Sequence, residues 1–125
     1  RTTPEAFLRG YRPVLGLKAR IVDTCLTGEF VQWPSTTQIA DNLGLSKSTL
    51  HRRLREEGQS IRAIKEERRR SQATYLLKST DLPIAKIAEM VGYAEPSAFH
   101  RSFAKWFSIT PGGLRQQHRA AAKQR

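Results

Sequence analysis

The sequence lacks features on which several large classes of protein depend. Its 125 residues include a single cysteine, Cys25, which excludes a disulfide framework and a cysteine-rich zinc site. No apolar run approaches the ~18 residues that a membrane-spanning helix needs. Asn-Gly and Asp-Gly turns are absent and alternating apolar runs are scarce, so β-hairpins are not predicted. The length also excludes α/β enzyme folds of ~200 or more residues.

Acidic residues are scarce relative to basic ones, 11 against 22, which gives a formal net charge of +11. Residues 1–50 carry 6 basic and 4 acidic side chains (+2), whereas residues 51–125 carry 16 and 7 (+9). This one-sided surplus favours a polyanionic partner, nucleic acid first and an anionic membrane surface second. A surface that is basic only for solubility is the alternative. The run Arg68–Arg70, flanked by Glu66 and Glu67, is interpreted as a solvated helix face with local ion pairs.

The sequence does contain a series of helical patterns, which predict an all-α fold of about seven helices. The expected helices run from Leu17 to near Gly28, from Ser35 to about Asn42, from Lys47 to Glu57, from Ser60 to about Lys78, from Asp81 to near Gly92, from about Pro96 to Phe107, and briefly from Thr110. Ser35, Ser46 and Asp81 are expected to cap the helices that follow them. Cys25 lies on an apolar stripe and is interpreted as a small buried hydrophobe.

One supersecondary unit occurs twice. Residues 39–45 (IADNLGL) align with residues 87–93 (IAEMVGY) at an offset of 48, with apolar, small and glycine positions in common. In each copy an alanine allows a second helix to cross closely, and a glycine (Gly44 or Gly92) accepts the positive φ of a tight turn. Two copies in register therefore predict two helix-turn-helix units.

The second helix of each unit has a polar face opposite its apolar one. At 100° per residue, Leu50 and Leu54 of the first copy and Phe99 and Phe103 of the second point to the core. The outward residues are Ser48, His51, Arg52 and Arg55 in the first copy, and Ser97, His100, Arg101 and Ala104 in the second. Short polar, histidine and arginine side chains can reach base edges in a major groove. An ordinary solvated helix face is the alternative, but two matched sets favour base recognition.

Three stretches carry a family resemblance: IADNLGLSKSTLHRRLREEGQS, RRRSQATYLLKSTDLPIAKIAEMVGYAEPSAFHRSFAKWF and ITPGGLR. Over about residues 18–116 the chain resembles the C-terminal DNA-binding domain of AraC/XylS-family bacterial transcription regulators. The resemblance implies two helix-turn-helix subdomains joined by a long linker helix, with both recognition helices in successive major-groove segments on one face of the duplex. A linker helix of ~18 residues is ~27 Å long, which is close to the ~34 Å of one DNA turn.

The resemblance also implies a domain organisation and a set of contact residues. The expected parts are a linker remnant or appended segment (1–16), a first subdomain (17–58), a linker helix (59–79), a second subdomain (80–119) and a basic tail that frays (120–125). By position, the family's base contacts fall on Ser48, His51, Arg52, Pro96, Ser97, His100 and Arg101. Phosphate contacts from helix N-termini would fall on Thr36, Thr37, Lys47 and the segment 83–86, including Lys86.

The second recognition helix, which begins at about Pro96, departs from the family pattern. Pro96, Ser97 and Ala98 give little side-chain reach, and Ala104 stands where the first copy has Arg55. Glu95 would lie near phosphates unless it caps the helix. We therefore expect the first subdomain to supply most of the base discrimination and the second mainly positioning.

These observations predict sequence-specific binding of double-stranded DNA by a transcription regulator, with no reaction, cofactor or metal. His51, His100 and His118 lie on separate predicted helices, which argues against a metal site. The resemblance further implies a bacterial activator in the cytoplasm at the nucleoid, contact with RNA polymerase, and dimerisation through an effector-sensing domain expected before Arg1. Two alternatives are the DNA-binding module of a recombinase or repair enzyme, and a basic module for anionic membrane or acidic protein. The last does not explain the matched glycines.

Overall fold

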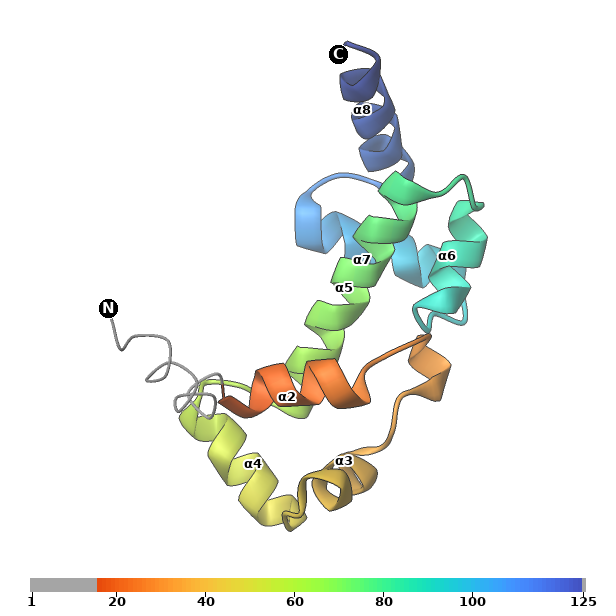
Figure 1. Ribbon diagram of the computed structural model, residues 1–125. Coiled ribbons are helices and arrows are strands. Elements are labelled where there is room, and N and C mark those ends of the chain that lie inside the picture. Colours follow the sequence, from red (N-terminus) through yellow and green to blue (C-terminus); the bar gives the residue numbers. More distant parts are fainter. Residues whose placement is uncertain (1–15, 125) are drawn as a thin grey trace, which may run out of the picture. The chain divides into compact units, whose positions relative to one another are not determined.

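The computed structural model describes residues 16–124, and this part of the chain is helical throughout its regular structure (Figure 1). The elements are α2 (Gly16–Cys25), η2 (a 3-10 turn, Phe30–Gln32), α3 (Thr36–Leu43), α4 (Lys47–Glu56), α5 (Ile61–Ser79), α6 (Ile84–Met90), α7 (Pro96–Phe107) and α8 (Pro111–Lys123). Seven α-helices, with no strand in the described range, confirm the all-α class. Apart from Gly16, the predicted linker remnant or appended segment over 1–16 lies outside the described residues.

The chain divides into two compact units and passes from one to the other three times along the sequence. Among the described residues, the first comprises 16–28 and 32–66, and the second comprises 29–31 and 67–124. Helix α5 therefore begins in the first unit and ends in the second. The short segment 29–31 falls within the predicted first subdomain, yet it packs with the second unit. In the described residues, no helix combines the length and apolarity needed to cross a bilayer.

The first unit encloses an apolar core between α2, α3, α4 and the first turns of α5. Its buried members are Leu17, Ile21, Cys25, Leu26, Trp33, Ile39, Ala40, Leu50, Leu54, Ile61 and Ile64. Cys25 is a free, buried thiol, as predicted. The N-terminus of α2 is capped by a residue that is distant in the sequence: the Glu57 carboxylate accepts a hydrogen bond from the Leu17 amide at 3.0 Å. An anion at this end of a helix is stabilised by the helix dipole.

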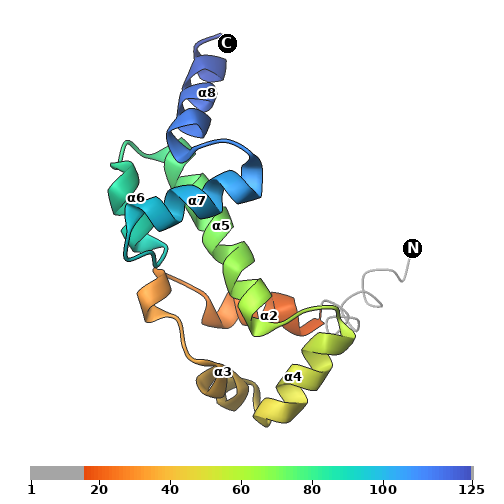
Figure 2. The same ribbon diagram turned by 180° about the vertical axis from the view of Figure 1, so that it is seen from behind.

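The second unit is built around two phenylalanines of α7. Phe99 and Phe103 are fully buried, with ring centroids 5.7 Å apart, and they pack against Ala73 and Leu77 of α5. Figure 2 shows α7 crossing α5, with α6 beside it. Trp106 is partly buried against this cluster.

Helix α8 is fixed to the end of α5 by Arg115. The guanidinium of Arg115 donates hydrogen bonds to the backbone oxygens of Leu77 (3.0 Å), Thr80 (3.1 Å) and Leu82 (2.6 Å). Carbonyl groups at a helix C-terminus lack partners within the helix. Arg115 thus satisfies one such carbonyl, that of Leu77, and two carbonyls of the loop after α5, and so fixes the start of α8 to that loop.

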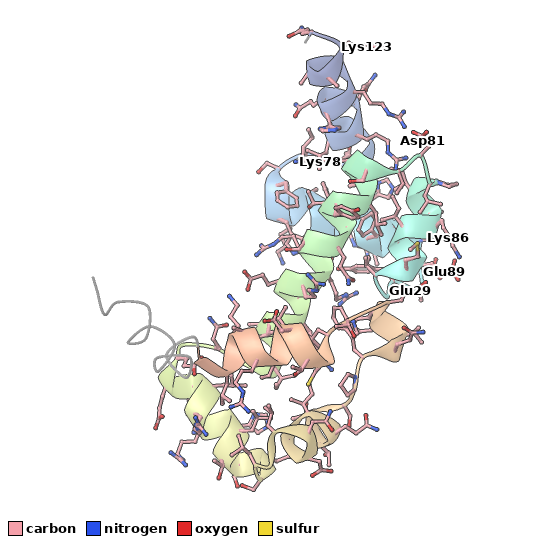
Figure 3. All side chains as sticks on the ribbon, viewed as in Figure 1. Glu29, Lys78, Asp81, Lys86, Glu89 and Lys123 are labelled. Carbon is pink, nitrogen blue, oxygen red and sulfur yellow. The ribbon has the colours of Figure 1, made fainter. Side chains whose placement is uncertain are left out.

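Two predictions near the C-terminus are wrong. Asp81, labelled in Figure 3, does not cap α6, because Pro83 occupies the N-cap position. Asp81 instead forms an ion pair with Arg119. Residues 120–125 were expected to fray, but α8 continues to Lys123 and is not short. Alanine has the highest helix propensity, and the run of three alanines after Arg119 extends the helix for that reason.

The repeated turn has the same backbone hydrogen bonds in both copies. The bonds are Gly44 N–H to Asp41 O (3.1 Å) and Leu45 N–H to Ala40 O (2.9 Å) after α3, and Gly92 N–H to Glu89 O (3.0 Å) and Tyr93 N–H to Ala88 O (2.9 Å) after α6. Gly44 and Gly92 have φ of +72° and +93°. Both turns are Schellman motifs, in which a left-handed glycine ends one helix and turns the chain toward the next. The predicted pair of helix-turn-helix turns is confirmed.

The two turn glycines differ in what a side chain would meet. A Cβ on Gly44 would have nothing within 4 Å, whereas a Cβ on Gly92 would lie 2.3 Å from Cδ2 of Phe30. We expect Gly44→Ala to lower the free energy of unfolding by ~1–2 kcal/mol through left-handed strain. Gly92→Ala should lower it further, because Phe30 must also move. Urea denaturation followed by circular dichroism measures both losses, and equal losses would contradict the role of Phe30.

Candidate nucleic-acid interface

Helix α4 is held so that one face is buried and the opposite face is open. Ser46 caps its N-terminus, with Oγ accepting a hydrogen bond from the Thr49 amide at 3.1 Å. Leu50 and Leu54 are fully buried and fix the inner face of the helix. The four residues predicted to face outward are all exposed: Ser48, His51, Arg52 and Arg55.

Arg52 is directed by a neighbour on its own helix. Its Nη1 lies 3.5 Å from Oε2 of Glu56, and the two side chains are 57% and 64% exposed. An exposed pair four residues apart on a helix is worth well under ~1 kcal/mol. The guanidinium is therefore available to a stronger partner such as a base or a phosphate.

Helix α7 has the same arrangement of a buried and an exposed face, but its N-terminus lacks a side-chain cap. Glu95 occupies the N-cap position with extended backbone, but its side chain makes no capping hydrogen bond, and Pro96 takes the first helical position. Pro96, Ser97, His100 and Arg101 are exposed. Each helix thus gathers its predicted base-contacting residues on one exposed face, and base contact itself stays a prediction.

The predicted phosphate-contacting residues all lie in the first turns of helices. Thr36 and Thr37 begin α3, Lys47 begins α4, and Lys86 is the third residue of α6. Thr36 is half-buried and the other three are exposed. The Nζ of Lys86 lies 3.8 Å from Oε1 of Glu89, and both side chains point outward from α6 (Figure 3).

The N-terminus of α3 is further organised by a capping box. Ser35 Oγ accepts a hydrogen bond from the Gln38 amide (3.2 Å), and Gln38 Oε1 accepts one from the Ser35 amide (2.9 Å). This reciprocal pair satisfies two amides that would otherwise lack partners. The remaining amides of that turn, flanked by two threonine hydroxyls, are donors of the kind that binds phosphate oxygens.

Both predicted recognition helices, α4 and α7, carry an excess of positive charge. Helix α4 carries Lys47, Arg52, Arg53 and Arg55 against one acid, and α7 carries Arg101 and Lys105 with no acid within its bounds. Clustered cations of this kind attract a polyanion. Over residues 16–124 no three His, Cys, Asp or Glu side chains are grouped to hold a metal ion. The three histidines lie on three different helices, α4, α7 and α8.

The interpretation of Arg68–Arg70 as a solvated face is wrong. All three are half-buried, and the Arg69 guanidinium lies over two aromatic rings, with Cζ 4.5 Å from the Phe30 centroid and 4.2 Å from that of Tyr93. Its Nε donates a hydrogen bond to the backbone oxygen of Val91 at 2.7 Å. Sequence patterns gave no signal for this, because both rings lie more than 20 positions away along the chain.

Comparison with known proteins places this geometry in a family. A sequence model of the family described as a helix-turn-helix domain matches residues 39–117. The HTH-type transcriptional regulator VirS of Mycobacterium tuberculosis is 38% identical over 107 residues, which are 86% of this chain and 28% of VirS. The uncharacterized HTH-type regulator Rv1395 of the same organism is 37% identical over 79 residues, 63% of this chain and 23% of that protein. The chain thus spans less than a third of these relatives.

Solved structures agree on the fold. A transcriptional regulator from Chromobacterium violaceum, described as having an AraC-type DNA-binding domain, gives a TM-score of 0.72 at 25% identity, covering 88% of this chain and 96% of that one. The DNA-binding domain of AdpA, solved in complex with a target DNA, gives 0.65 at 21% identity, covering 90% and 98%. The family match extends over more than half of the sequence, and the chain therefore belongs to the AraC/XylS-type family of helix-turn-helix domains, which occur in transcriptional regulators.

Proposed function

We propose that this chain binds double-stranded DNA in a sequence-specific manner, as the DNA-binding domain of a bacterial transcription regulator. The observation that carries the proposal is the pair of helices α4 and α7. Each is fixed from behind by two fully buried residues and exposes a matched serine, histidine and arginine in front. A helix with its side chains is ~10–12 Å wide and fits a major groove of ~12 Å. The AdpA domain, which has the same fold, was solved with DNA.

The proposed contacts divide between bases and phosphates. Base edges would be contacted by Ser48, His51, Arg52 and Arg55 from α4 and by Pro96, Ser97, His100 and Arg101 from α7, in successive major-groove segments. Phosphates would be contacted by Thr36, Thr37, Lys47 and Lys86. Arginine forks onto guanine more specifically than shorter side chains do. Because α4 exposes two such arginines, Arg52 and Arg55, and α7 exposes only Arg101 in that set, α4 should supply most of the discrimination.

In the cell, the proposal assigns this domain to a cytoplasmic regulator that acts on the chromosome. Activation through contact with RNA polymerase, and dimerisation through a further domain, are proposed from the family. No chemical reaction and no cofactor enter the mechanism, since affinity arises from phosphate neutralisation and specificity from side chains in the groove. The alternative of a recombinase or repair enzyme finds no support, because the relatives named above are regulators.

Binding should depend steeply on salt. With ~6–10 phosphate contacts, affinity should fall by ~10³–10⁵ between 50 and 200 mM salt. Lys86→Ala should make the slope of log K against log[salt] shallower by about 1 and weaken binding equally on all sequences. Lys123→Ala is the matched control, because Lys123 ends α8 and lies well away from α6 (Figure 3). Fluorescence anisotropy at several salt concentrations measures the slopes, and a shallow wild-type response would count against DNA binding.

Arg52 and Arg53 offer a matched pair for testing base readout. Arg52 lies opposite the buried leucines of α4, whereas Arg53, turned by 100°, lies on the flank of the helix. We expect Arg52→Ala to lower discrimination at one base of the first half-site by ~1–3 kcal/mol. Arg53→Ala should weaken binding without changing base preference.

Competition binding with single-base variants of a duplex selected from a random pool measures both effects. Equal loss of discrimination in both half-sites on Arg52→Ala would contradict the assignment of Arg52 to the first one.

A further inference from the structure

The turn of the second helix-turn-helix unit is completed by a segment from far upstream. Residues 29–31 belong to the second unit, although Gly28 before them and Gln32 after them belong to the first. The ends of this excursion are tied together, because Nε1 of Trp33 donates a hydrogen bond to the backbone oxygen of Gly28 at 3.2 Å. A short loop with joined ends therefore delivers Phe30 to the loop that follows α6 (Figure 1).

Phe30 and Arg69 enclose this turn from two sides, and we name Phe30, Arg69, Val91, Gly92 and Tyr93 the turn clasp. The Phe30 ring fills the space in which any Cβ at position 92 would lie. The Arg69 guanidinium lies over the rings of Phe30 and Tyr93, and its Nε donates a hydrogen bond to the backbone oxygen of Val91, the C-cap residue that follows α6. Every residue of the turn from 91 to 93 thus contacts either Phe30 or Arg69.

The chemistry of the clasp requires an arginine at position 69. A guanidinium is planar, so it can lie against aromatic faces and donate hydrogen bonds in its own plane at the same time. A lysine keeps the charge but presents a point ammonium that cannot do both. In the first unit no described residue takes the place that Phe30 has beside Gly92, because a Cβ built on Gly44 meets nothing within 4 Å.

We propose that Phe30 and Arg69 are positioning residues of the second recognition helix. By fixing the backbone between Val91 and Tyr93, they set the direction in which α7 leaves the turn, and with it the placement of Ser97, His100 and Arg101. Base readout in the second half-site then depends on a residue that precedes the first helix-turn-helix unit in the sequence. This inference rests on the proposed DNA binding, and it predicts that the first half-site is read independently of the clasp.

The test uses the whole chain with two disruptive and two control substitutions. Phe30→Ala removes the ring, and Arg69→Lys keeps the charge while losing the stacked, hydrogen-bonded geometry. Phe30→Tyr keeps the ring, and Val31→Ala alters the adjacent residue, which is 82% exposed. Discrimination is measured on duplexes with either half-site scrambled, and amide hydrogen exchange is measured in the free protein.

The clasp predicts a half-site-specific result. Phe30→Ala and Arg69→Lys should lower discrimination in the second half-site by about tenfold and leave the first unchanged, while Phe30→Tyr and Val31→Ala match the wild type. Exchange should accelerate at the amides of Gly92 and Tyr93 and not at those of Gly44 and Leu45. Should Phe30→Ala fail to fold, Arg69→Lys carries the same test.

Three results would overturn the inference. These are wild-type behaviour of Arg69→Lys, equal losses in both half-sites, and unchanged exchange at Gly92 in the clasp variants. Wild-type behaviour of Arg69→Lys would assign Arg69 a role that its charge alone can fill, such as phosphate contact. If the wild-type chain binds no DNA, the proposed function fails, but hydrogen exchange still decides whether the clasp fixes the turn.

Discussion

The left-handed turn between paired helices is the constraint on which the rest of the structure depends. Gly44 and Gly92 take positive φ, and each turn is closed by the same two backbone hydrogen bonds to the preceding helix. The buried alanine that accepts one of these bonds, Ala40 or Ala88, keeps the crossing close. Once the turn is set, the next helix can bury its apolar stripe only by exposing the opposite one. The recognition face is therefore a consequence of the turn and of core packing together.

The two units meet this constraint with different supports. In the first unit, serine caps stabilise the helix N-termini: Ser35 and Ser46 each accept a hydrogen bond from an amide at the start of the helix they precede. In the second, neither Pro83 nor Glu95 caps with a side-chain hydrogen bond. Arginines stabilise the opposite ends of helices there: Arg69 donates a hydrogen bond to the carbonyl of Val91 after α6, and Arg115 donates one to the carbonyl of Leu77 in the last turn of α5. Part of the positive charge of this chain is thus structural, and counts of basic residues overstate the charge available to DNA.

What could be predicted from sequence is what depends on neighbours along the chain. The serine caps, the repeated glycine turns and the inward and outward faces of α4 and α7 follow from spacings of a few residues, and the structure confirms them. Other contacts join residues that are far apart along the chain: the clasp, the Arg115 contacts and the Asp81–Arg119 pair. Arg69 and Val91 are 22 positions apart, and Asp81 and Arg119 are 38 apart. No periodicity marks such pairs, so Arg69 resembled a solvated residue and Asp81 a helix cap. Base contact by the exposed faces of α4 and α7 stays a prediction, because it depends on the DNA as well as on the chain.

The central claim is that α4 and α7 read base edges with their exposed faces. A crystal structure of the chain bound to a duplex selected from a random pool tests it most directly. The account predicts both helices in the major groove, with Arg52 and Arg101 within hydrogen-bond distance of base atoms and Leu50 and Phe99 still buried. A complex in which either helix faces solvent, or in which both arginines contact only phosphates, would contradict it.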